Sequence, residues 1–96
     1  MKTFTLHYDA GHGWLKVTAD QLHSCNLDEA DFSAYSYRDG DQIFYLEEDL
    51  DCSVFLRAWE AVHGAAEVIG HDDGSWSWIR GLAHVRPRTI DDEVLF

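Results

Sequence analysis

The chain is poor in the features that mark membrane, secreted and disulfide-stabilised proteins. No apolar run in its 96 residues approaches the roughly 20 residues of a transmembrane helix. Residues 1–5 alternate in polarity, where a signal peptide would have an apolar block. Cys25 and Cys52 lie far apart in the sequence and form no C-x-x-C pair. We therefore expect a cytoplasmic protein whose cysteines are reduced.

Basic residues are scarce. Seven Lys and Arg face eighteen Asp and Glu, so the formal net charge is −11. Residues 1–79 carry all of it, whereas residues 80–96 are neutral. A charge this negative repels nucleic acid and anionic membranes, and it favours the basic surface of another protein as the partner. Solubility alone is the plainer interpretation of the same charge, and the oligomeric state is left open.

Motifs of catalysis and cofactor binding are missing. The chain has no G-x-S-x-G, no Walker A sequence and no G-x-G-x-x-G. His7, Asp9 and His12 invite a metal or catalytic interpretation, but no third ligand follows at a workable spacing. His71-Asp72-Asp73 has the same weakness. We expect no enzyme activity, no cofactor and no bound metal, with an enzyme or metal-dependent protein around His7, Asp9 and His12 as an alternative.

What the chain does have is enough apolar sequence for one small core. A hydrophobic share of 46% is too high for a disordered chain, and the length suits a single domain over residues 1–96. Its last part, residues 81–96, is expected to be irregular, although Ile90 and residues 94–96 could dock on the body.

Alternating polarity and turn residues predict three β-hairpins. Their turns fall near residues 11–13, 39–41 and 72–74. Residues 43–46 are apolar on both faces, which is typical of a central strand. A helix follows each of the first two hairpins. The sequence thus predicts an α+β fold in the order ββαββαββ, with an antiparallel sheet and two helices packed on one face.

Both expected helices have start signals. Thr18 and Gln21 form a capping box for the first. Asp51 is expected to cap the second by accepting a hydrogen bond from a free first-turn N–H, and Gly64 is expected to end it. The apolar stripe expected to face the core consists of Val54, Phe55, Ala58, Trp59 and Val62.

Two features predict a partner-binding surface. The first is a corner of four acids between strand and helix, and capping explains at most two of them. The second is a pair of tryptophans expected on one face of a strand over residues 76–80, although a second small core under the C-terminal segment is an equal alternative. The residues expected to bind a partner are Asp39, Asp41, Glu47, Glu48, Asp49, Asp51, Trp76 and Trp78.

Four short motifs carry a resemblance. They are GHGW at residues 11–14, YSYRDGD at 35–41, YLEED at 45–49 and FLRA at 55–58. Their order and spacing resemble small uncharacterised acidic proteins of bacterial phages, plasmids and mobile elements. The resemblance covers roughly residues 3–60 and carries no catalytic residue across. It implies a context in which anti-CRISPR and anti-restriction proteins of similar size and charge occur.

Together these observations predict an inhibitor from a phage or mobile element. It would bind a host nucleic-acid-handling defence complex, of the kind anti-CRISPR proteins block, through an acidic, aromatic-rich surface. It would contact the basic protein surface rather than nucleic acid or a membrane. Besides the enzyme alternative, an acidic immunity-type or structural accessory protein remains open.

Overall fold

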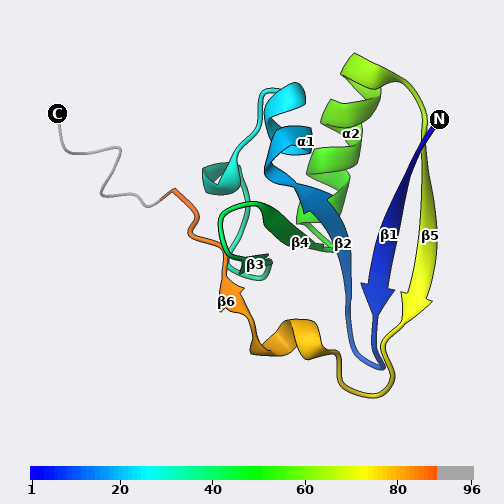
Figure 1. The fold of residues 1–96 in the computed structure, drawn as a ribbon, viewed down its shortest axis with the longest axis vertical. Coiled ribbons are helices and arrows are strands. Elements are labelled where there is room, and N and C mark those ends of the chain that lie inside the picture. Colours follow the sequence, from blue (N-terminus) through cyan, green and yellow to red (C-terminus); the bar gives the residue numbers. More distant parts are fainter. Residues whose placement is uncertain (89–96) are drawn as a thin grey trace, which may run out of the picture.

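The computed structural model describes residues 1–88 and has an α+β fold, which confirms the expected class. A six-stranded sheet in the order β5-β1-β2-β4-β3-β6 carries the helices α1 and α2 on one face (Figure 1). The expected docking of Ile90 and residues 94–96 lies outside the described residues. The elements are β1 (Lys2–Tyr8), β2 (Gly13–Thr18), α1 (Ala19–Ser24), η1 (a 3-10 helix, Glu29–Asp31), β3 (Tyr37–Asp39), β4 (Ile43–Glu47), α2 (Asp51–His63), β5 (Ala66–Asp72), η2 (a 3-10 helix, Trp78–Gly81) and β6 (Ala83–His84).

The middle of the sheet follows from the alternating sequence. β1 and β2 form the first expected hairpin, and β2 pairs antiparallel with β4, with Leu15 opposite Leu46. The second hairpin, β3–β4, turns through Gly40 at a positive φ of 68°. In β4, Phe44 joins the core beneath the helices, whereas the next residue, Tyr45, joins a second core on the other face. β4 is therefore a central strand, as expected.

The two helix starts differ from each other. The capping box of α1 is confirmed, because the Gln21 N–H donates to Thr18 Oγ1 at 3.1 Å and the Thr18 N–H donates to Gln21 Oε1 at 2.9 Å. For α2 the expected cap is wrong. Leu50 occupies the cap position, and the carboxylate of Asp51, the first helical residue, accepts hydrogen bonds from Ser33 and Ser36 instead.

The core beneath the helices depends on α2. Phe55 and Trp59 are buried, and the ring of Phe4 meets both edge-to-face at centroid distances of 5.2 and 5.1 Å. Val54 and Val62 were expected in the same stripe but are exposed, because the buried face is turned toward the side that carries Asp51. The fully or nearly buried members of this core are Phe4, Leu15, Val17, Ala19, Leu22, Cys25, Phe32, Phe44, Leu46, Phe55, Trp59 and Val85.

The order ββαββαββ is confirmed, but the third hairpin is wrong. β5 pairs with β1 in parallel, with His7 opposite His71, because α2 carries the chain back across the sheet. Residues 78–81 form the 3-10 helix η2 instead of a strand, since the Ser77 hydroxyl accepts the Ile79 N–H and caps the turn. Within residues 1–88 the last strand is β6, which pairs with β3.

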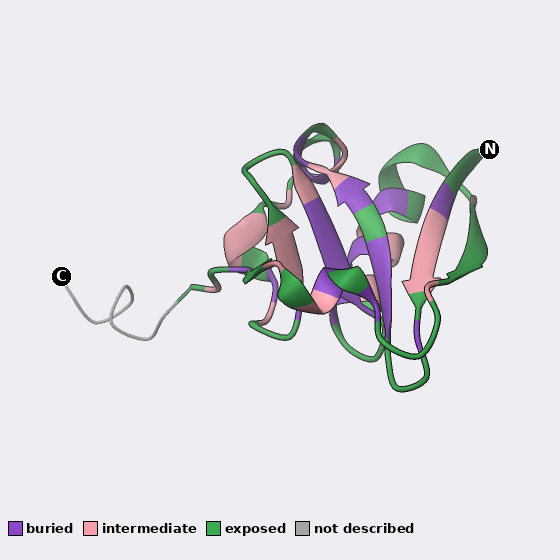
Figure 2. Ribbon diagram, turned by 60° about the horizontal axis from the view of Figure 1, so that its bottom comes forward, coloured by how far each residue is buried: buried purple, intermediate pink, exposed green. Residues whose placement is uncertain are grey.

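A second, smaller core lies on the sheet face away from α1 and α2. Trp14, Tyr45 and Ile79 are buried there, with Tyr37 and Leu82 packed against them. The segment around η2 covers this face through Ile79 and Leu82, so a second small core exists, but Trp76 and Trp78, which were expected in it under that alternative, are exposed. Figure 2 shows the result: β4 is largely buried, whereas β5 at the sheet edge is almost wholly exposed. In residues 1–88, neither α1 nor α2 has the length and hydrophobicity that a membrane span requires.

Candidate functional site

The acidic corner between β4 and α2 divides into two kinds of residue. Glu47 is buried, and its carboxylate accepts the Leu50 N–H at 3.0 Å. Asp51 is buried as well and bound to the serines described above. Glu48 and Asp49 are exposed. The charges available to a partner at this corner are therefore chiefly those of Glu48 and Asp49.

Asp39 and Asp41 do not join this corner. Asp39 ends β3 and Asp41 lies in the turn that follows, so both are at the start of β4, whereas the corner begins at its last residue, Glu47. Both aspartates are exposed, and Asp41 forms an ion pair with Arg38. The acids expected on one surface thus form two surfaces at opposite ends of a strand.

Trp76 and Trp78 are exposed, with 71% and 52% of their surface accessible. They do not share the face of a strand, because Trp78 is in η2. Trp76 lies against the Arg80 guanidinium, 4.4 Å from its ring centroid. Trp78 packs edge-on against Tyr45 at 5.2 Å. Each tryptophan therefore belongs to a different neighbourhood of the same face.

An open groove lies between the acidic corner and the aromatic residues Trp14, Tyr35 and Tyr37, and Trp76 and Trp78 are not among its lining residues. Its volume is about 390 Å³, and we call it the aromatic groove. Tyr35 and His84 were absent from the expected site. The pairing of β3 with β6 sets His84 opposite Tyr37 and could not be inferred from the sequence. Tyr35 is exposed because its neighbour Ser36 is buried. The groove is lined by His12, Trp14, Tyr35, Tyr37, Glu47, Asp49, Leu50, Arg80 and His84.

An ion pair supports the floor of the groove. Arg80 donates to Asp9 through Nε at 2.6 Å and through a terminal nitrogen at 2.9 Å, and the Ser77 N–H donates to the same carboxylate at 2.8 Å. The guanidinium lies 5.1 Å from the ring centroid of Trp14. The Arg80 hydrogen bonds, with those from backbone N–H groups, hold the pKa of Asp9 far below its usual value although burial opposes this.

Acid should destabilise the protein through Asp9. Because the Asp9 pKa is lower in the folded state than the unfolded value of about 3.9, the unfolded state binds the extra proton below that pH. Its contribution is complete above about pH 4 and is lost as the pH falls toward the folded pKa. We expect the difference in unfolding free energy between the wild type and Asp9→Asn, measured in urea, to shrink steadily below about pH 4. A difference that stays constant as the pH falls below about 4 would contradict this.

The structure places the side chains of His7 and His12 in different groups, although the His12 backbone N–H donates to Asp9 Oδ1 at 3.0 Å. Asp9 is occupied by Arg80 as described. Among the described residues, His12 lies with Glu47 and Asp49, whereas His7 lies with His71 and Asp73.

Cys25 and Cys52 are both free thiols in the structure of residues 1–88. Burial raises the pKa of the Cys52 thiol to about 11, which keeps it protonated at neutral pH.

Comparisons with protein-family models, with curated proteins and with solved structures find no match for this chain.

Proposed function

We propose that this protein is a non-enzymatic inhibitor that binds the basic surface of a nucleic-acid-handling complex in a bacterial host. The observation that carries the proposal is the aromatic groove, where the exposed ring of Tyr35 and the half-buried ring of Tyr37 lie with the exposed carboxylate of Asp49. The net charge of −11 also supports the proposal, because it attracts a basic protein surface over a long range. A CRISPR-type effector as the target is the narrower form of the proposal, and it rests on the resemblance alone.

The groove has the chemistry that receives a Lys or Arg side chain. Tyr35 and Tyr37 offer ring faces, which attract cations through their π-electron density. Asp49 offers an exposed carboxylate beside them, and Glu48, the residue before it, is exposed as well. The one guanidinium already in the groove, that of Arg80, is neutralised by Asp9, so the lining keeps a net negative charge.

The other acids contribute at longer range. Asp39 and Asp41 extend the negative field beyond the groove, at the far end of β4. Opposite charges on two partners raise the association rate more than they raise the final affinity. The groove would therefore fix the position of a basic side chain, and the remaining acids would speed the encounter.

The proposal can be tested by capture and competition. Wild-type protein and a Tyr35→Ala, Asp49→Asn variant are immobilised, and host lysate is passed over both. The proposal is supported by a host protein that only the wild type retains and that added DNA or RNA releases. This host protein should also be captured without the nucleic acid that it normally binds. Equal retention by both variants, or retention that nucleic acid does not affect, would argue against a nucleic-acid surface as the target.

Neutralising the exposed corner should slow association with that partner. In Glu48→Gln, Asp49→Asn we expect a lower association rate and a weaker dependence of binding on salt, because two exposed charges next to the groove are lost. Wild-type binding should weaken as the Debye length falls from about 10 Å at 0.1 M to about 3 Å at 1 M. Surface plasmon resonance across a salt series measures both effects.

The matched control removes the same charge elsewhere. Asp20→Asn, Glu60→Gln neutralises two exposed acids on α1 and α2, on the opposite face of the sheet. If the corner is the contact, this control should keep most of the wild-type association rate. Equal loss in the two double variants would mean that only total charge matters, and salt-insensitive binding would reject the electrostatic contact.

A further inference from the structure

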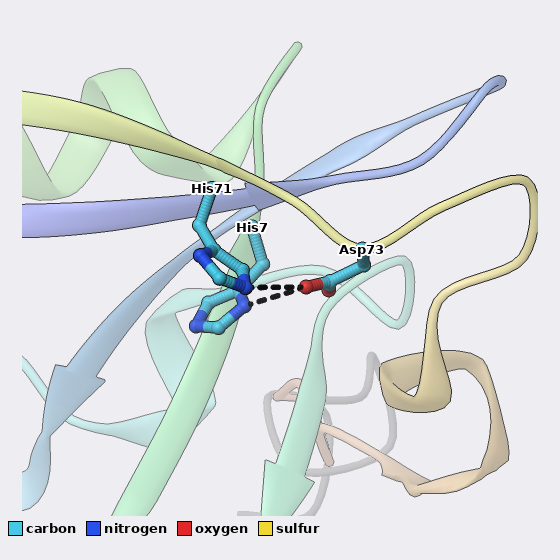
Figure 3. Close-up of side chains that lie close together, drawn as sticks. All are labelled: His7, His71 and Asp73. Carbon is cyan, nitrogen blue, oxygen red and sulfur yellow. Dashed lines mark hydrogen bonds and ion pairs between the residues drawn. The ribbon is translucent and has the colours of Figure 1, made fainter.

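The parallel pairing of β1 and β5 gathers three side chains that are distant in the sequence. His7 and His71 are directly opposite in the register, and Asp73 follows at the end of β5. Figure 3 shows both imidazole rings directed at the carboxylate of Asp73. We propose that His7, His71 and Asp73 form a binding site for a divalent transition-metal ion of the zinc type.

The separations of the ligand atoms suit this ion. His7 Nδ1 lies 3.1 Å and His71 Nε2 lies 3.6 Å from the same oxygen, Asp73 Oδ1. Zinc at 2.0–2.1 Å from tetrahedral ligands places them about 3.4 Å apart. One ring nitrogen of each histidine lies within 4.8 Å of the other, and His71 is exposed, so its ring is not held by surrounding side chains as that of His7 is.

The surroundings hold two of the three ligands in place. The Asp73 side chain is only 3% exposed, and its second oxygen accepts the Ser77 hydroxyl at 2.6 Å. The His7 ring is flanked by Tyr45 and Trp78 at centroid distances of 5.8 and 5.9 Å. Such supporting contacts orient metal ligands and raise affinity. His71, 63% exposed, leaves an open path for the ion and a coordination position for water.

The ligand set favours zinc over magnesium or calcium. Two imidazole nitrogens and one carboxylate are typical zinc ligands, whereas magnesium and calcium require mainly oxygen. The expectation of no bound metal rested on the lack of a third ligand near His7 and His12. The pairing of β5 with β1, which sequence spacing does not reveal, brings two further ligands to His7: His71 in β5, and Asp73 directly after it.

Zinc binding to the full chain tests the proposal directly. Isothermal titration with zinc chloride and elemental analysis after dialysis should give one ion per chain. His71→Ala, which removes an exposed side chain and should leave the fold intact, should weaken binding by about tenfold or more. Binding should also weaken in acid, because protons compete with zinc for the ligand atoms.

Two variants identify the site. His23→Ala removes an exposed histidine of α1 outside the cluster and should bind zinc like the wild type. His12→Ala tests the other candidate group, His12 with Glu47 and Asp49, and should also bind normally. The proposal is overturned by the absence of stoichiometric zinc, by wild-type affinity in His71→Ala, or by a loss confined to His12→Ala.

Discussion

Phe55→Ala is expected to lower the free energy of unfolding by about 3–5 kcal/mol. The Phe55 side chain has 0% exposure and packs between Phe4 and Trp59, with ring centroids 5.2 and 5.9 Å away. Truncation removes the buried ring and leaves a cavity that its neighbours fill only in part. Since domains of this size are stable by about 5–15 kcal/mol, the change should remove a large share of the total.

Denaturant unfolding followed by tryptophan fluorescence measures this loss. The matched control is Val54→Ala, one residue earlier in α2, where the side chain is 41% exposed. A substitution at such a position should change stability by less than about 0.5 kcal/mol. If the control costs as much as Phe55→Ala, or if Phe55→Ala unfolds like the wild type, the assigned buried face of α2 is wrong.

The parts of the fold that the sequence predicts are those decided by near neighbours. Strand β1 alternates in polarity, β4 is a short run that is apolar on both faces, and Thr18 and Gln21 are three residues apart in their capping box. Gly64 ends α2 with a positive φ of 88°, which glycine adopts at little cost. Each of these features involves contacts within a few residues of the chain, so a local pattern is enough to reveal them.

The third hairpin was misassigned because distant contacts decide the pairing of β5 and the conformation of residues 76–80. The alternation Ser75-Trp76-Ser77-Trp78 has the period of a strand, yet residues 78–81 are helical. Ser77 is buried, its N–H bound by Asp9 and its hydroxyl by Asp73. Both partners are fixed by folding of the rest of the chain, and residue spacing in this segment carries no sign of them.

The candidate site was half predictable for the same reason. The concentration of acids after β4 and the surplus of aromatic residues are plain in the sequence, and the aromatic groove unites part of both sets. Which acids are exposed was not predictable. Ser36 reads as the outward position of an alternating strand, but it is fully buried and binds both Asp51 and the Glu47 N–H. Because Ser36 binds Asp51 and the backbone of Glu47, these two residues of the corner support the fold.

Asp51→Ala is therefore expected to cost about 2–4 kcal/mol, since hydrogen bonds to a buried charged group are worth about 1.5–3 kcal/mol and their loss leaves donors unsatisfied. The Asp51 carboxylate accepts the Ser33 N–H at 3.0 Å, the Ser33 hydroxyl at 2.7 Å and the Ser36 hydroxyl. A simple helix cap would be worth only about 0.5–2 kcal/mol. Urea unfolding of the variant measures the loss, and a loss above about 2 kcal/mol would exceed what a helix cap contributes.

A double-mutant cycle with Ser36→Ala separates the two explanations where the ranges overlap. If Asp51 acts through the serines, the two substitutions should be coupled by about 1 kcal/mol or more, because each removes the same hydrogen bond. If Asp51 acts only on the start of α2, their costs should add. Asp20→Ala, which removes an exposed acid from the first turn of α1, is the control for the helix dipole and should cost less than about 1 kcal/mol. Additive costs, or a loss for Asp51→Ala no larger than this control, would show that the link between residues 33–36 and α2 contributes little to stability.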